Sequence, residues 1–180
     1  TIWTYGTAME KLAQEIGSID MQALGLMNKG MAFSIRGEFE KSDSCYQKAL
    51  DMFSANVGEI EKAKVWMNMG ISALSKGLLS EASDFHERAL EVVKREKHKT
   101  LQSALLTNLA NVKSQQGDIA QAVEMYTNSL QLNEQIGDSA SIGNNLSNIG
   151  MCYSMMGDVE KARPYYRRAA QMFRLSGQAQ

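Results

Sequence analysis

The sequence predicts an all-α solenoid of antiparallel helix pairs. The first observation is an internal repeat of forty residues, kept four times without insertion or deletion. It is marked by the asparagines Asn28, Asn68, Asn108 and Asn148, by the glycines Gly37, Gly77, Gly117 and Gly157, and by the leucines Leu50, Leu90 and Leu130. The second observation is that the apolar residues of each repeat recur at helical spacing. A fixed period of this size is typical of arrays in which each repeat buries its apolar face against its neighbours.

Repeat one shows the plan that every repeat follows. A first helix is predicted from about Met21 to Ile35, because Leu26, Gly30 and Phe33 fall at i, i+4 and i+7 on one face. Gly37 is expected to end it, since glycine is the preferred residue just past a helix terminus. The second helix carries one stripe, made by Ser42, Tyr46, Ala49, Leu50 and Phe53.

Repeats two to four follow the same plan. Their first helices carry the stripes Trp66, Gly70 and Ala73; Leu106 and Ala110; and Leu146, Gly150 and Tyr153. Their second helices carry Ala82, His86, Ala89 and Leu90; Ala122, Tyr126 and Leu130; and Ala162, Tyr166 and Ala169. The first residues match the tail of a second helix, with Tyr5 in the column of Cys45. We therefore expect about nine helices in a single array, divided into a partial repeat 1–17 and full repeats 20–57, 60–97, 100–137 and 140–177.

Composition excludes several classes of function. The net charge is −1 and the pI about 6.1, so no basic stripe favours a nucleic-acid partner. No stretch is long enough to span a bilayer. Two distant cysteines make no disulfide framework and favour a reducing, cytoplasmic location. The two histidines, His86 and His98, have no metal-ligand spacing, and His86 takes the place of a core tyrosine. We expect no cofactor, no metal and no enzymatic activity. The chain begins with Thr, which suggests a piece of a longer protein.

These columns resemble the tetratricopeptide repeat. The resemblance is carried by Trp66-x-x-x-Gly70, Tyr153, the four glycines, Ala82/122/162, Tyr46/126/166 and Ala49/89. The forty-residue period is longer than the usual 34 and is similar to the long variant of kinesin light chains and Pins-type G-protein adaptors. The resemblance implies a right-handed superhelix, with first helices on the concave side, and a role as an adaptor or scaffold.

The side of the first helices opposite the buried stripe is the predicted binding surface. Of sixteen residues on it only Lys64 is charged, whereas ten of sixteen are charged on the outer side of the second helices. Carboxamides both donate and accept hydrogen bonds, so a row of them can hold a peptide backbone, while methionines give adaptable apolar contacts. The predicted peptide-binding residues are Asn28, Asn68, Asn108, Asn111, Asn144, Asn148, Lys64, Met27, Met31, Met67, Ile71 and Met151. In related long repeats, asparagines in this column hold a bound peptide.

Alternatives remain at this point. The asparagines could instead join neighbouring helices and hold the superhelix together. The predicted function is binding of an extended or helical segment of a partner protein. The alternative is a regulatory or self-assembly segment whose concave face is occupied by its own chain or by a second copy. A homodimer could form through that face or through the terminal helices, where Trp3 and Phe173 are candidate contact residues.

Overall fold

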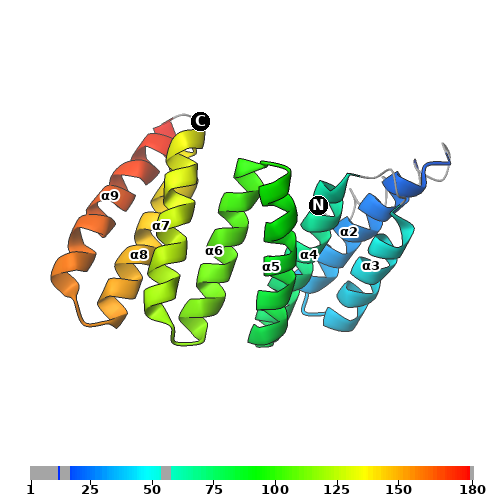
Figure 1. The fold of residues 1–180 in the computed structure, drawn as a ribbon, viewed down its shortest axis with the longest axis horizontal. Coiled ribbons are helices and arrows are strands. Elements are labelled where there is room, and N and C mark those ends of the chain that lie inside the picture. Colours follow the sequence, from blue (N-terminus) through cyan, green and yellow to red (C-terminus); the bar gives the residue numbers. More distant parts are fainter. Residues whose placement is uncertain (1–11, 13–16, 54–57, 179–180) are drawn as a thin grey trace. The chain divides into compact units, whose positions relative to one another are not determined.

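The computed structural model describes residues 12, 17–53 and 58–178 of the chain. These residues form α-helices joined by short turns, which confirms the all-α prediction (Figure 1). The helices are α2 (Ile19–Ile35), α3 (Phe39–Met52), α4 (Glu59–Ser75), α5 (Leu79–Arg95), α6 (Lys99–Gln115), α7 (Ile119–Ile136), α8 (Ser139–Met155) and α9 (Val159–Gln178). The additional helix expected within 1–17 lies outside the described residues, as do Trp3 and Tyr5.

The helices belong to two compact units, Thr1–Val92 and Val93–Gln180. In the first unit α3 packs against both α2 and α4, and α2 also contacts α4. In the second unit α7 packs between α6 and α8, and α8 packs on α9. Consecutive helices of each unit run antiparallel (Figure 1). Within each unit the first helices of the two repeats also meet, since α2 contacts α4 and the Thr107 hydroxyl of α6 donates to Asn145 of α8.

The repeated glycines end the first helices as predicted. At the end of α4 the N–H of Gly77 donates to the carbonyl of Leu74 at 3.0 Å, and the N–H of Leu78 donates to Ala73 at 2.9 Å. Gly77 adopts a φ of +76°, in the left-handed region that residues with a Cβ rarely enter. This pattern closes the helix by satisfying its last carbonyls and turns the chain back into α5.

The starts of the later helices are capped by aspartates. Asp118, Asp138 and Asp158 each accept a hydrogen bond from the backbone N–H three residues further on, at distances of 3.0–3.2 Å. A carboxylate in this place satisfies one of the N–H groups that a helix leaves unpaired at its beginning and also interacts favourably with the helix dipole. The aspartate caps mark the starts of α7, α8 and α9, and the repeated glycines mark the ends of the first helices.

Small residues of the first helices let the second helices approach closely. A Cβ at Gly30 would lie 2.6 Å from Cε1 of the Tyr46 ring, so the ring occupies the space that a side chain would need. Gly70 lies equally close beneath the His86 ring. His86 is fully buried, as expected for a residue in the tyrosine column. The glycines and the rings therefore form one packing contact that recurs from repeat to repeat.

Each unit has its own apolar core. In the first unit it is formed by Ala23, Tyr46, Ala49, Phe53 and Val65. In the second unit it is formed by Ala110, Ala122, Tyr126, Leu130, Ile142, Leu146, Ile149, Cys152 and Ala169. Both cores lie between first and second helices.

Candidate functional site

The first-helix surface is defined here separately for each unit: it is the side of α2 and α4 in the first unit, and of α6 and α8 in the second, that carries the asparagine column. Asn28, Asn68, Asn108 and Asn148 are all half-buried. Within the described residues, the carboxamides of Asn68, Asn108 and Asn148 make no hydrogen bond, whereas Asn28 has an interaction of its own. For these three asparagines the structure thus gives no sign of the alternative role, in which the amides join neighbouring helices.

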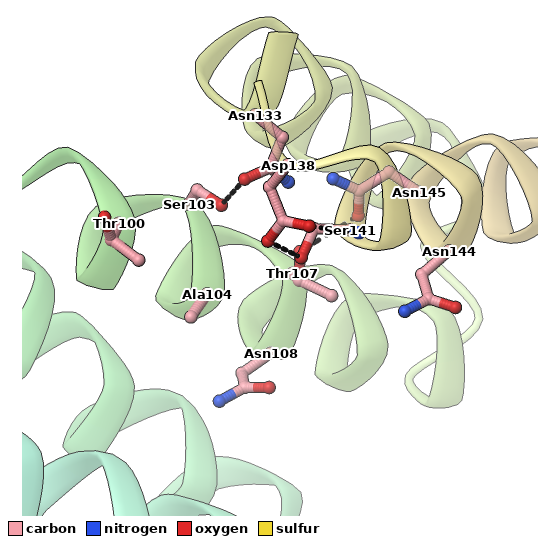
Figure 2. Close-up of a pocket in the computed structure, with 10 residues that line it drawn as sticks. All are labelled: Thr100, Ser103, Ala104, Thr107, Asn108, Asn133, Asp138, Ser141, Asn144 and Asn145. Atoms are coloured by element: carbon pink, nitrogen blue, oxygen red, sulfur yellow. Dashed lines mark hydrogen bonds between the residues drawn. The ribbon is translucent and has the colours of Figure 1, made fainter. Parts of the chain in front are cut away.

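A pocket of about 240 Å³ lies on this surface between α6 and α8. It is lined by Thr100, Ser103, Ala104, Thr107, Asn108, Asn133, Asp138, Ser141, Asn144 and Asn145. Two predicted residues, Asn108 and Asn144, are therefore brought together from different repeats. Figure 2 shows their carboxamides pointing away from the hydrogen-bonded side chains of the pocket. The pocket offers free amide groups at its rim and satisfied polar groups in its floor.

Asn145 is the centre of the floor. It is 1% exposed, and its Nδ2 donates to Ser129 Oγ of α7 at 2.9 Å. Its Oδ1 accepts from Thr107 Oγ1 of α6 at 3.0 Å. One amide of α8 thus bridges the two helices of the preceding repeat. At this junction a neighbouring position, Asn145, fills the role that one alternative assigned to the asparagine column.

A second buried amide completes the floor. Asn133 of α7 accepts a hydrogen bond through its Oδ1 from the hydroxyl of Ser103 in α6. The hydroxyl of Ser129 donates to the backbone carbonyl of Ser103 at 2.8 Å. Buried polar groups are tolerated only when they are hydrogen-bonded, and a fully connected set holds its members in one arrangement. The floor is therefore a fixed base for the groups at the rim.

Asp138 supplies the one charge among the residues that line the pocket. Its Oδ2 accepts from the Ser141 hydroxyl at 2.7 Å and its Oδ1 from the Ser141 N–H at 3.0 Å. These hydrogen bonds, the hydroxyl first, hold the pKa of the Asp138 carboxyl below its usual value. The carboxylate is therefore occupied as the helix cap of α8. The pocket is suited to forming hydrogen bonds with a neutral polar guest.

The remaining predicted residues have varied surroundings. The Oδ1 of Asn111 accepts a hydrogen bond from the Tyr126 hydroxyl, which leaves the NH₂ group of its side chain to donate to a guest. Lys64 forms an ion pair with Glu61, with Nζ and Oε1 2.7 Å apart. Ile71 and Met151 are 41% and 44% exposed. Met27 packs against the core of the first unit, while Met31 and Met67 are half-buried.

Sequence reasoning missed the buried polar network, although the repeat columns contain a signal for it. Ser129 stands where the other repeats have Ala49, Ala89 and Ala169. Asn133 stands in the column of Phe53, Val93 and Phe173, and Asn145 in the column of Gly25, Val65 and Leu105. A polar residue in an apolar column needs a buried partner. Three such exceptions around one helix junction indicate a local polar cluster, but not the identity of its hydrogen bonds.

Two adjacent asparagines give a direct test of the network. Asn145→Ala should lower the free energy of unfolding by about 2–3 kcal/mol, because it removes two buried hydrogen bonds and leaves the Thr107 and Ser129 hydroxyls short of a partner. Asn144→Ala, at the exposed rim, should change it by less than about 0.5 kcal/mol. Urea denaturation followed by circular dichroism measures both. Equal effects of the two substitutions would show that the network does not hold these helices together.

Within the part of the chain that the structure describes, no helix is both long and apolar enough to cross a membrane. No group of three or more histidine, cysteine, aspartate and glutamate side chains there is placed to hold a metal ion.

Comparisons with known proteins agree with this architecture. Two tetratricopeptide repeat models match residues 24–56 and 101–174. No curated protein matches the sequence significantly. Among solved structures, BtubC (BKLC) from P. vanneervenii is 20% identical with a TM-score of 0.77 over 88% of this chain and 66% of its own. RapI in its apo form is 22% identical with a TM-score of 0.78, over 87% of this chain and 57% of its own.

A third structure shows a related array with a partner. It is a Rap protein complexed with competence and sporulation factor, 17% identical with a TM-score of 0.74, over 86% of this chain and 43% of its own. This chain thus spans between 43% and 66% of the length of the three solved structures. At such identities the likeness concerns the fold alone. The repeat models, the column pattern and the fold together show that the chain belongs to the tetratricopeptide repeat family, whose arrays are protein-interaction scaffolds.

Proposed function

We propose that this chain binds an extended segment of a partner protein along the first-helix surface of its second unit and holds the backbone of that segment with asparagine carboxamides. The observation that carries the proposal is the pocket between α6 and α8, whose rim presents Asn108 and Asn144 without hydrogen-bond partners among the described residues. A peptide backbone needs both donors and acceptors, and each carboxamide supplies both.

The spacing of the asparagines supports a backbone contact rather than a point contact. Asn108 and Asn111 lie three residues apart on α6, and Asn144 and Asn148 lie four apart on α8, so each pair shares one helix face. The helices α6 and α8 can then each meet the guest at two heights. Because the amides are neutral, such contacts read the backbone and leave the sequence of the guest largely free.

Apolar contacts would come from exposed side chains beside the asparagines of each unit. Met151 of α8 follows Asn148 by three residues, and in the first unit Ile71 of α4 follows Asn68 by three. Methionine is flexible and polarizable, so it adapts to guests of different shape. Lys64 is engaged with Glu61. A guest gripped by a cluster of free cations, such as a terminal carboxylate, is therefore not favoured.

The solved Rap complex supports the general mode of action. A related array takes a partner, competence and sporulation factor, in that structure. The identity is too low to transfer contact residues, so the proposal rests on the amides of this chain.

The proposal is tested with peptides chosen by the protein itself. Random twelve-residue peptides displayed on phage are selected on the wild-type chain, and their affinities are measured by fluorescence anisotropy. The double variant Asn108→Ala, Asn148→Ala should bind them at least about tenfold more weakly, because several backbone hydrogen bonds of about 1 kcal/mol each are lost. Its melting temperature should stay within about 2 °C of the wild type, since neither carboxamide is bonded within the fold.

Asn128→Ala is the matched control. Asn128 is an exposed asparagine on α7, a second helix, and its loss should leave affinity unchanged. Equal binding by the double variant and the wild type would contradict the proposal. So would a failure to select any peptide together with a concentration-independent dimer in light scattering, which would favour the alternative of a self-assembly segment.

A further inference from the structure

One hydrogen-bond donor in the floor of the pocket between α6 and α8 is not used within the described chain. The carboxamide of Asn133 is 3% exposed, and its Oδ1 accepts from the Ser103 hydroxyl. Its Nδ2 carries two N–H groups, and no hydrogen bond among the described residues uses this nitrogen. A buried donor without an acceptor is costly. Asn133 lines the pocket, so a guest there can supply the acceptor.

An acceptor with spare capacity lies close to this donor. The backbone N–H of Asp138 donates to the carbonyl of Asn133 at 3.2 Å, so both residues belong to one turn. Both side chains lie at the pocket in Figure 2, and no hydrogen bond joins them. Each Asp138 oxygen accepts one hydrogen bond from Ser141, whereas a carboxylate has about four lone-pair positions. The pocket thus presents a free donor and a charged acceptor from the same turn.

This combination fits a primary carboxamide, the end group of glutamine and asparagine side chains. Such a group carries a C=O and an N–H on one edge, so it can accept from Asn133 and donate to Asp138 at once. A trans peptide group points its C=O and N–H in opposite directions, so the backbone of a guest does not match the pair. A guest carboxylate lacks the donor and is repelled by Asp138, and an ammonium group lacks the acceptor.

The depth of the pocket favours glutamine over asparagine. The peptide-binding proposal places the backbone of the guest against Asn108 and Asn144 at the rim. Asn133 is buried below that rim, so a guest side chain must extend downward before it meets the donor. Glutamine is one methylene longer than asparagine. The pocket, of about 240 Å³, has far more space than a single water needs.

The pair of groups occurs at one junction of the repeat pattern. In the other repeats the column of Asn133 holds apolar residues, which are Phe53, Val93 and Phe173. The column of Asp138 holds uncharged or weakly basic residues, which are Ser18, Gly58 and His98. A guest that lies along the first-helix surface therefore meets this amide and carboxylate once. One side chain of the guest is read here, and the amides at the rim contact its backbone.

We propose that the pocket between α6 and α8 is a subsite for a glutamine side chain of the bound segment. The side-chain carbonyl of the glutamine accepts a hydrogen bond from Asn133 Nδ2, and its amide nitrogen donates to the carboxylate of Asp138. The subsite rests on the proposed function for the presence of a guest segment. It adds one position of side-chain recognition to a surface that otherwise contacts the backbone.

The first test examines the pocket without a peptide. The full chain, labelled with ¹⁵N, is titrated with propanamide, which copies the end of a glutamine side chain, and the side-chain amide signals are followed by NMR. Propanamide at roughly 50 mM should shift the Asn133 signals and leave those of the exposed Asn128 in place. N-methylacetamide, which copies a peptide group, and propanoate should each shift the Asn133 signals at least about threefold less. Equal shifts from the three compounds, or none from propanamide, would overturn the inference.

The second test uses the peptides selected on the wild-type chain. Each should contain one glutamine whose replacement by glutamate weakens binding at least about tenfold, because Asp138 repels the acid. Asp138→Asn removes this repulsion but keeps the helix cap, since asparagine caps as well as aspartate, and the preference should fall below about threefold. Asp118→Asn is the matched control. It removes the same charge from the cap of α7, outside the pocket, and should leave the preference unchanged.

The subsite and the peptide-binding proposal fail in different ways. Selected peptides without such a glutamine, or a preference that survives Asp138→Asn, would overturn the subsite. The weaker binding of the Asn108→Ala, Asn148→Ala variant would then still support the binding surface. If no peptide is selected, the peptide-binding proposal fails, and the propanamide titration still shows whether the pocket accepts a carboxamide.

Discussion

Replacing Tyr126 with alanine is expected to lower the free energy of unfolding by about 3–5 kcal/mol, the usual cost of removing a buried aromatic ring. Tyr126 is 1% exposed and packs in the core shared by α6, α7 and α8. The substitution leaves a cavity between three helices and removes the hydroxyl that donates to Asn111. Chemical denaturation followed by circular dichroism measures the loss.

Tyr166→Ala is the matched comparison for Tyr126→Ala. Both tyrosines occupy the same repeat column. The Tyr166 ring lies against Gly150 of α8, and Tyr126 packs in one core with Ala110 of α6. Tyr166 is 42% exposed because no helix of the described chain covers it. Its removal should therefore cost only about 1 kcal/mol. Similar losses for the two variants would show that burial against the next first helix does not determine stability in this array.

Acidification is expected to destabilise the chain through His86. Burial lowers the pKa of His86 to about 4, from about 6.5 in the unfolded chain. Between these values the unfolded state binds the proton and the folded state does not, so stability falls as the pH falls. The contribution should be about 2 kcal/mol at pH 5 and about 3 kcal/mol once the pH is below 4, relative to neutral pH. Denaturation curves across this range measure it.

His86→Phe isolates this contribution from the titration of surface carboxylates. Among the described residues neither ring nitrogen of His86 has a hydrogen-bond partner, so phenylalanine loses no buried hydrogen bond of that part of the chain. The variant should be at least as stable as the wild type at pH 7, and its stability should fall less between pH 6.5 and pH 4. An unchanged pH dependence would mean that His86 does not remain neutral and buried in solution.

Much of the fold could be predicted from the order of residues. The forty-residue period, the glycines after each first helix and the apolar stripes depend on local chemistry and on contacts that repeat along the chain. Gly77 can be interpreted as a stop because few other residues enter its backbone conformation. His86 can be placed in the core because three tyrosines share its column. In a repeat protein each position is seen several times, so the pattern of one repeat supports that of the next.

The candidate site could be predicted only in part from the sequence. The neutral character of the first-helix surface follows from helical geometry, and so does the shared face of Asn108 and Asn111. The choice between Asn144 and Asn145 does not follow, since both are asparagines on one helix and differ in direction by about 100°. Asn145 is buried among hydroxyls from α6 and α7, and Asn144 faces the pocket. That difference depends on how three helices pack together.

The repeat period thus determined the helices, their ends and their buried stripes, because these depend on residues close in sequence or on columns that recur. The pocket between α6 and α8, its polar floor and the covering of Tyr126 but not of Tyr166 depended on tertiary packing. The physical reason is that hydrogen bonds between side chains and exclusion from water require groups from different helices to meet within a few ångströms. A periodic pattern places such groups on a face but does not pair them.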